Sequence, residues 1–200
     1  MANPRPPNEG QLSSGLPGVT HYITGHDSST SKAIVQSTRP GSWVPVLKGA
    51  NGFDVVYTTS EFPASLNDDK DLKAHDELMS SKKLGLVSPN GTVCRIVDFA
   101  PGAEPLMHRT QSLDYGVVLE GTMEMSLDSG EISLLHRGDV AVQRATMHGW
   151  RNSSKTDWAR MLFVLQDCQP VVIDGKSLGE DLSHAKDAGE NIPASRSEAV

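Results

Sequence analysis

The chain has 200 residues, of which 37% are apolar, and a formal net charge of −7. This length allows one domain with a buried core, and the low apolar fraction predicts polar terminal segments. The negative charge argues against a surface that binds nucleic acid or an anionic membrane. The chain contains no run of about 18 apolar residues, so we expect no membrane span. The start MANPRPPNEG lacks the apolar core of a secretory signal, and Cys94 and Cys168 show no metal or redox spacing, so we expect a reduced, cytoplasmic protein with free thiols.

The N-terminal part is predicted to hold a tail, several strands and one helix. Residues 1–17 are rich in Pro, Gly, Asn and Ser, and we expect them to trail as a disordered tail. Over residues 18–90, β-type runs such as KAIVQSTRP and FDVVYTTS alternate with turns, among them Asn51-Gly52. Helical spacing of apolar residues predicts a helix over about Asp69–Ser81, with His75 on its packed face. This block is predicted to pack on the main domain.

Residues 91–175 carry a β signal throughout. In TVCRIVDF, residues Val93, Arg95, Val97 and Phe99 share one face because strand side chains alternate. Further short strands, YGVVLE, TMEMSL, EISLL, DVAVQ and WARMLFVLQ, follow at intervals typical of a sandwich or barrel. Residues 176–200 turn polar and are predicted to form a tail with a short helix or coil. The fold class is therefore mainly β, a single barrel with added N-terminal strands and one or two short helices.

Two histidine-bearing segments stand inside this β region. His108 and Thr110 are two apart on an extended segment and so share a face, and His148 and Trp150 do the same in the second segment. A turn back after a three-residue excursion is expected to bring Asp114 beside His108. If both segments line one barrel, His108, Asp114 and His148 converge in its mouth. Two imidazoles and a carboxylate are the ligand set of open-faced metal sites.

The spacing of these residues resembles the two motifs of the cupin superfamily. The first motif, Gly, five residues, His-x-His, three or four residues, Glu, six residues, Gly, is matched from Gly102 to Gly121, with Thr110 in place of the second His and Asp114 in place of the Glu. The second motif is matched from Gly138 to Asn152 through His148, one residue short and without its Pro and Gly. The resemblance implies a cupin-type barrel, also called a double-stranded β-helix or jelly roll.

The resemblance also implies a metal and a dimer. Cupins typically hold Fe, Mn, Ni, Zn or Cu with three His and one Glu, so His108, Asp114 and His148 are the candidate ligands of a divalent metal such as Fe, Zn, Mn or Ni. The alternative is that His108 only forms hydrogen bonds inside the barrel. Cupins often dimerise through N-terminal strands, which implies a homodimer here, with the strands of residues 18–90 as the dimerisation arm. No nucleotide cofactor is expected. The segments HRTQSLDYGVVLEG and GDVAVQRATMHGWRN also resemble a subgroup of small cupins from microbial and fungal genomes. This resemblance suggests a role in secondary metabolite biosynthesis.

The same residues suit chemistry without a metal. Asp114 within reach of His148 would raise the pKa of that imidazole and orient it as a general acid or base. Arg95 and Arg160 are candidates for holding a carboxylate or enolate, or else are surface or rim charges. Trp150, with Met123 and Met125, forms either a pocket wall or plain core. The other histidines, His21, His26, His136 and His184, are expected at the surface.

Three functions remain open from the sequence. The first is a lyase or isomerase that dehydrates, decarboxylates or cyclises a small carboxylate, carbonyl or polyketide-like substrate through His148, Asp114 and His108, with Thr110, Trp150, Arg95 and Arg160 around the substrate. The second is an Fe(II)-dependent dioxygenase with the same three metal ligands. The third is a cupin that binds a small molecule without turnover.

Overall fold

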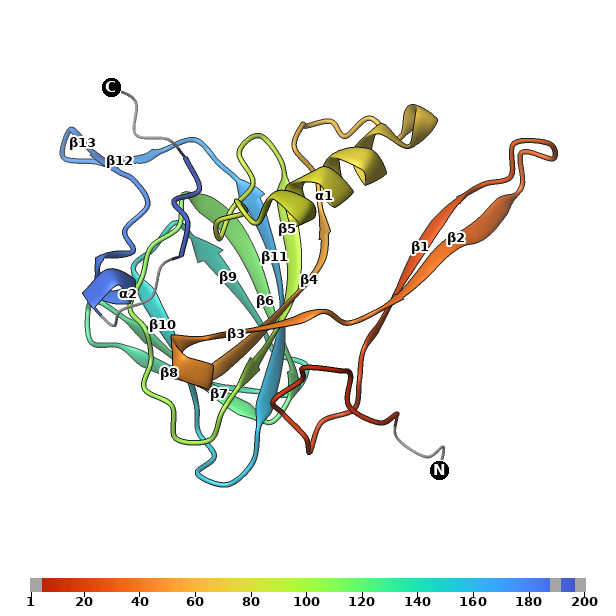
Figure 1. Ribbon diagram of the computed structural model, residues 1–200. Coiled ribbons are helices and arrows are strands. Elements are labelled where there is room, and N and C mark those ends of the chain that lie inside the picture. The colour runs from red at the N-terminus through yellow and green to blue at the C-terminus, as the bar shows by residue number, and fades with distance from the viewer. Residues whose placement is uncertain (1–4, 188–191, 197–200) are drawn as a thin grey trace.

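The computed structural model describes residues 5–187 and 192–196 (Figure 1). Two sheets form a barrel that confirms the predicted mainly β cupin fold. One sheet has the strand order β3-β4-β5-β11-β6-β9 and the other β10-β7-β8. The strands of the larger sheet are β3 (Trp43–Val46), β4 (Asn51–Thr58), β5 (Thr92–Phe99), β11 (Ala159–Asp167), β6 (Ser112–Glu120) and β9 (Val140–Arg144); those of the smaller are β10 (His148–Asn152), β7 (Thr122–Leu127) and β8 (Ile132–His136).

Alternation along the strands decides which side chains enter the barrel. Val97 of β5 lies opposite Met161 of β11, and Phe163 of β11 lies opposite Arg95 of β5, all on the inner face. Gly116 of β6 leaves room for Phe163, because a Cβ there would come within 2.9 Å of the Phe163 ring. The inner faces of the two sheets meet in one core, which β7 and β10 complete with Met123 and Trp150.

The N-terminal segment lies against the barrel instead of trailing from it. Within the described residues 5–17, the Ser13 hydroxyl donates to the buried Asp98 carboxylate, and the carbonyl of Pro17 accepts a 2.7 Å hydrogen bond from Arg160. Composition did not reveal this, because the partners that order the segment lie far along the chain. Residues 1–4 of the predicted tail lie outside the described part.

A hairpin follows and extends away from the barrel (Figure 1). It consists of β1 (Thr20–His26) and β2 (Ala33–Pro40). At its base, His21 is 8% exposed and bonds the buried Asp54 carboxylate at 2.7 Å, so its predicted surface position is wrong. The side chains of His26, His136 and His184 are exposed as predicted.

The helix α1 (Lys70–Ser81) confirms the predicted helix, and a 3-10 turn, η2 (Asn67–Asp69), leads into it. His75 is buried, bonds Thr58 at 2.9 Å and stacks on Tyr57, as a packing histidine does. The predicted Asn51-Gly52 turn is wrong, because both residues begin strand β4. The reversal before them is made by the 3-10 turn η1 (Leu47–Gly49).

The C-terminal part also returns to the barrel. It comprises a small hairpin, β12 (Val171–Ile173) and β13 (Lys176–Leu178), a short helix α2 (Ser183–Asp187) and the segment 192–196. In that segment, Ser195 accepts a 3.0 Å bond from the Val87 amide and donates its own amide to Glu180 at 2.9 Å. Residues 188–191 and 197–200 of the predicted polar tail lie outside the described part. No helix of the described residues is long and apolar enough to cross a membrane.

Candidate active site

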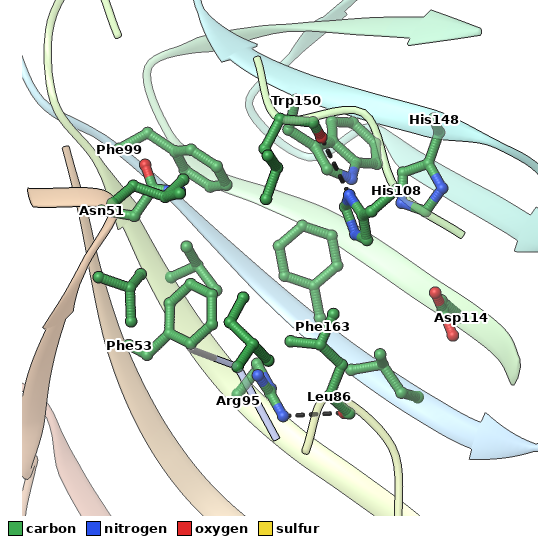
Figure 2. A pocket seen from close by; sticks show the side chains of 16 residues that line it. Asn51, Phe53, Leu86, Arg95, Phe99, His108, Asp114, His148, Trp150 and Phe163 are labelled. Carbon is green, nitrogen blue, oxygen red and sulfur yellow. Dashed lines mark hydrogen bonds between the residues drawn. The ribbon is translucent and has the colours of Figure 1, made fainter. Parts of the chain in front are cut away.

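A cavity inside the barrel is lined by five of the candidate residues, Arg95, His108, Asp114, His148 and Trp150 (Figure 2). It encloses about 680 Å³ between protein atoms, part of it open to solvent. Its wall is mostly apolar and aromatic, with few polar groups, which is the usual character of a small-molecule site. The aromatic lining residues are Phe53, Phe99, Trp150 and Phe163, and the polar ones are Asn51, Arg95, His108, Asp114 and His148.

His108 and His148 form a pair at one side of this cavity. His148 opens strand β10, and His108 lies on the extended segment before β6. Their backbones exchange two hydrogen bonds of 2.8 and 2.9 Å, which places the residues directly opposite each other. As a result their ring centroids lie 4.4 Å apart, at an interplanar angle of 48°. The two histidine segments thus line one barrel, which was the condition for their convergence.

Each imidazole is held in one tautomer by a backbone carbonyl. Nδ1 of His108 lies 3.0 Å from the Leu106 oxygen, and Nδ1 of His148 lies 2.9 Å from the Thr146 oxygen. A carbonyl oxygen accepts only, so both Nδ1 atoms carry the proton and both Nε2 atoms carry a lone pair in the neutral ring. Burial lowers the pKa of His108, and burial together with the neighbouring His108 lowers the pKa of His148 to about 3. Both rings are therefore neutral bases at physiological pH.

Asp114 lies within strand β6 with its side chain directed inward. Burial raises its pKa to about 6, against the lowering effect of hydrogen bonds from Ser112 and Thr110 and of the charge on Arg95. The Thr110 hydroxyl donates to Oδ2 at 3.3 Å, whereas Oδ1 is buried without a hydrogen-bond partner. A buried carboxyl oxygen without a partner is costly in a purely structural role and is typical of a functional one.

Asp114 does not join the histidine pair as expected. Strand β6 begins at Ser112, so Asp114 belongs to the barrel wall and not to an excursion before it. Figure 2 shows its carboxyl apart from both imidazoles, and no hydrogen bond among the described residues connects them. The expectation that Asp114 orients His148 and raises its pKa is wrong, since the pKa of His148 is lowered.

This arrangement decides whether the site can hold a divalent metal. The histidine pair has the features of metal ligands, since Nε2 is free and Nδ1 is fixed by a carbonyl. However, no three His, Cys, Asp or Glu side chains within residues 5–187 and 192–196 are grouped closely enough to hold an ion. The predicted ligand set of His108, Asp114 and His148 is thus not assembled. The residues as they lie do not fit a resident metal with three protein ligands.

Arg95 places a positive charge in the cavity wall. Its side chain is 4% exposed, so the alternative of a surface or rim charge is wrong. Nη2 donates to the carbonyls of Gly85 and Leu86 at 3.0 and 2.8 Å, and the guanidinium lies over the Phe53 ring, 5.2 Å from its centroid. Burial lowers the pKa of Arg95 to about 10, which leaves it charged at neutral pH. Its Nε is buried without a hydrogen-bond partner.

Arg160 and Thr110 do not line the cavity. The guanidinium of Arg160 is buried on the other side of the sheet, where it donates two bonds of 2.6 and 2.8 Å to Asp98 and lies over the Trp43 ring. Thr110 acts on the site only through its bond to Asp114. Trp150 lines the cavity and belongs to the core as well, whereas Met123 is core alone.

Several lining residues were not predicted from the sequence. Phe163 could have been found, because Met161, Phe163 and Leu165 alternate on the predicted last strand and so face inward. Leu86 and Ile192 carry no such signal, since they lie in irregular segments that reach the cavity through tertiary contacts. Phe53 lies on a predicted strand, but the sequence does not show that this strand joins the barrel sheet.

Known proteins resemble the chain over most of its length. A family model described as "Cupin domain" matches residues 95–165. Phomopsin biosynthesis cluster protein D of Diaporthe leptostromiformis is 46% identical over 158 residues, 79% of this chain and 83% of the relative. Oryzines biosynthesis cluster protein J of Aspergillus oryzae is 41% identical over 172 residues, 86% and 95% of the two chains. The cupin-domain-containing oxidoreductase fogC of Aspergillus ruber is 42% identical over 167 residues, 82% and 80% of the two chains. The chain therefore belongs to the cupin superfamily.

Proposed function

We propose that the chain is a cupin-fold tailoring enzyme that acts by proton transfer on a small organic substrate in the barrel cavity. One observation carries the proposal: a single apolar cavity contains two imidazoles of lowered pKa, a carboxyl of raised pKa and a buried guanidinium. Ionisable groups whose pKa values are displaced in opposite directions are typical of acid–base sites. Relatives from biosynthesis clusters support a role in secondary metabolism.

The histidine pair is the proposed base. Nε2 of His148 or His108 is unprotonated at neutral pH and faces a site that aromatic side chains shield from water. Such a lone pair can accept a proton from a carbon next to a carbonyl group. The carbonyls of Leu106 and Thr146 hold both rings and bind the proton on Nδ1, so no further tautomer change is needed.

Arg95 and Asp114 have the complementary roles. When the base takes the proton, negative charge develops on the substrate oxygen, and the Arg95 guanidinium stabilises this enolate. In a dehydration, Asp114 in its protonated form, which a pKa of about 6 makes the minor form at neutral pH, then gives its proton to a departing β-hydroxyl group. The C–O bond breaks, water leaves and a carbon–carbon double bond forms. The proton on the imidazole returns to Asp114 through solvent. In an isomerisation, the imidazolium returns the proton to another carbon of the enolate.

The proposal is tested by deuterium exchange, which needs no knowledge of the natural substrate. Aromatic β-hydroxy ketones and 1,3-diketones are incubated with the protein in D₂O, and incorporation at the carbon between or beside the carbonyls is followed by mass spectrometry. We expect exchange above the buffer rate for the wild type and a loss of about 10²-fold or more in a His108→Gln, His148→Gln double variant. His136→Gln, at an exposed histidine, is the matched control. Equal rates in the double variant and the wild type would refute the proposed base.

A second candidate is an Fe(II)-dependent dioxygenase. Several relatives are named cupin-domain-containing oxidoreductases, and paired imidazoles with free Nε2 atoms suit a metal. This candidate needs Asp114 to join the histidines, which it does not do here. Elemental analysis after incubation with Fe(II), Zn, Mn or Ni separates the two candidates. Stoichiometric iron together with iron-dependent oxygen uptake favours the dioxygenase, and exchange activity that persists after chelation favours proton transfer. Ligand binding without either activity would leave a non-enzymatic binder.

We further propose that the chain forms a homodimer through its N-terminal hairpin. The hairpin extends away from the barrel into solvent (Figure 1). It nevertheless carries large apolar side chains, and Tyr22 and Val35 are 62% and 57% exposed. On the outer face of the barrel, Tyr115 of β6 lies beside Val142 of β9, and both are also exposed. Apolar side chains that cluster on an arm and on a sheet face are typical of an interface between subunits.

A further inference from the structure

A second hollow, here called the outer groove, adjoins the barrel cavity. It lies between strands β3 and β4, the C-terminal end of α1 and the described C-terminal segment. It holds about 1620 Å³ between protein atoms, part of it open to solvent, and is therefore the roomier of the two. The lining side chains are mainly aliphatic, among them Val44, Pro45, Val55, Leu78, Met79 and Leu84.

The outer groove and the barrel cavity share one wall. Five residues line both spaces, namely Val46, Phe53, Leu86, Arg95 and Ile192. Arg95 is the charged member of this set, so the buried guanidinium stands at the junction of the two spaces. A ligand that occupies both must therefore pass close to this cation.

The state of Arg95 indicates what it binds. A buried cation is costly unless an anion or several acceptors satisfy it. Two carbonyls bond Nη2, but Nε has no partner, and no ion pair joins Arg95 to a carboxylate among the described residues. Asp114 acts on it only through its charge at longer range. A ligand with an acidic oxygen completes this arrangement.

From these observations we propose the class of substrate, which rests on the proposed function. It is an amphiphile with three parts: a compact unsaturated head beside His108 and His148, an acidic oxygen on Arg95, and an apolar chain in the outer groove. A carboxylate, phenolate or enolate can supply the acidic oxygen. Each methylene of the chain that the aliphatic lining of the groove removes from water increases the binding free energy.

The chain-length part of the proposal is tested with benzoate, ortho-butylbenzoate and ortho-hexylbenzoate. Their dissociation constants are measured by calorimetry, which needs no turnover. We expect affinity to rise about fourfold for each added methylene that enters the groove. Val44→Glu puts a carboxylate on the groove wall at a 57% exposed position and should abolish this gain while benzoate still binds. Val172→Glu, at a 62% exposed position outside both spaces, is the matched control.

The charge part is tested with ortho-hexylbenzamide, which has nearly the same shape as ortho-hexylbenzoate but no charge. We expect the amide to bind at least about tenfold more weakly, because Arg95 prefers a charged acceptor. An Arg95→Gln variant, checked for folding by circular dichroism, should bind the two ligands equally. This comparison does not depend on the variant, since the wild type alone already discriminates the two ligands.

Several results would overturn the proposal. The first is equal affinity for benzoate and ortho-hexylbenzoate in the wild type. The second is equal affinity for the acid and the amide. The third is the same loss of the chain-length gain in Val44→Glu and Val172→Glu. A Val44→Glu variant that changes the oligomeric state but keeps the chain-length gain would assign the groove to a protein neighbour instead. Failure of the proposed function gives a different outcome, namely no deuterium exchange while the dependence on chain length persists.

Discussion

The lowered pKa of His148 predicts how the stability of the fold depends on pH. In the unfolded chain this imidazole titrates near its ordinary value of 6.5, and in the folded chain its pKa is about 3. Between these values the unfolded chain binds a proton that the folded chain does not. Stability therefore falls as the pH falls through this window, and the loss begins at the unfolded value.

The size of the effect follows from the two pKa values. At about pH 5 the unfolded imidazole is nearly all protonated and the folded one is not, so His148 alone costs about 2 kcal/mol relative to about pH 7. Asp114 acts in the opposite sense. Its pKa is raised from 3.8 to about 6, so the folded chain gains a proton first, and stability rises by about 1 kcal/mol over the same interval. His108 adds to the loss, because its pKa is also lowered.

The assay is urea unfolding of the chelated protein at about pH 7 and about pH 5, with the wild type, His148→Gln and Asp114→Asn. His148→Gln should lose about 2 kcal/mol less than the wild type on acidification, and Asp114→Asn should lose about 1 kcal/mol more. Comparing each variant with itself at two pH values removes its overall stability change. If His148→Gln and the wild type lose the same amount, the imidazole is not neutral and buried as described.

Further predictions concern the ion pair, the arm and the metal. Asp98→Asn should lower the free energy of unfolding by about 3 kcal/mol, because it leaves Arg160 buried without a counter-charge. Asp128→Asn, at an exposed turn, should change this free energy little, and thermal denaturation measures both variants. Sedimentation velocity should show a dimer for the wild type and a monomer for a Tyr22→Lys, Val35→Lys variant, and a monomeric wild type would contradict the proposed arm. Protein incubated with Fe(II) and then desalted should retain clearly substoichiometric iron, since three ligands are not grouped; full occupancy would show that Asp114 moves.

The fold was predictable because its signals are local. Alternation in TVCRIVDF places Val93, Arg95, Val97 and Phe99 on one face, and strand β5 has these bounds and that inner face. Spacing likewise brought His108 and His148 together, because the two motifs occupy neighbouring segments of a barrel. Helical periodicity located α1 to within one residue at its start.

The parts that were missed depend on distant partners. The position of Asp114 depends on whether β6 begins at Ser112 or at Tyr115. The strand extends to Ser112 because Asp114 pairs with Gln143 and Leu165 on neighbouring strands, which the local sequence does not show. The burial of Arg95 depends on two carbonyls supplied by the segment after α1. Composition alone marked the N-terminal segment as a tail, although Asp98 and Arg160 bind it from strands that come much later.

The paired backbone bonds between His108 and His148 have a consequence for genetics as well as for chemistry. The backbones of these two residues exchange two hydrogen bonds and so move together. A change that moves one ring therefore also moves the other. Their substitutions should therefore be strongly non-additive in a double-mutant cycle, with a coupling energy of about 0.5–3 kcal/mol. Over evolutionary time the two positions should vary jointly or not at all, and a lineage that loses one imidazole has little reason to keep the other.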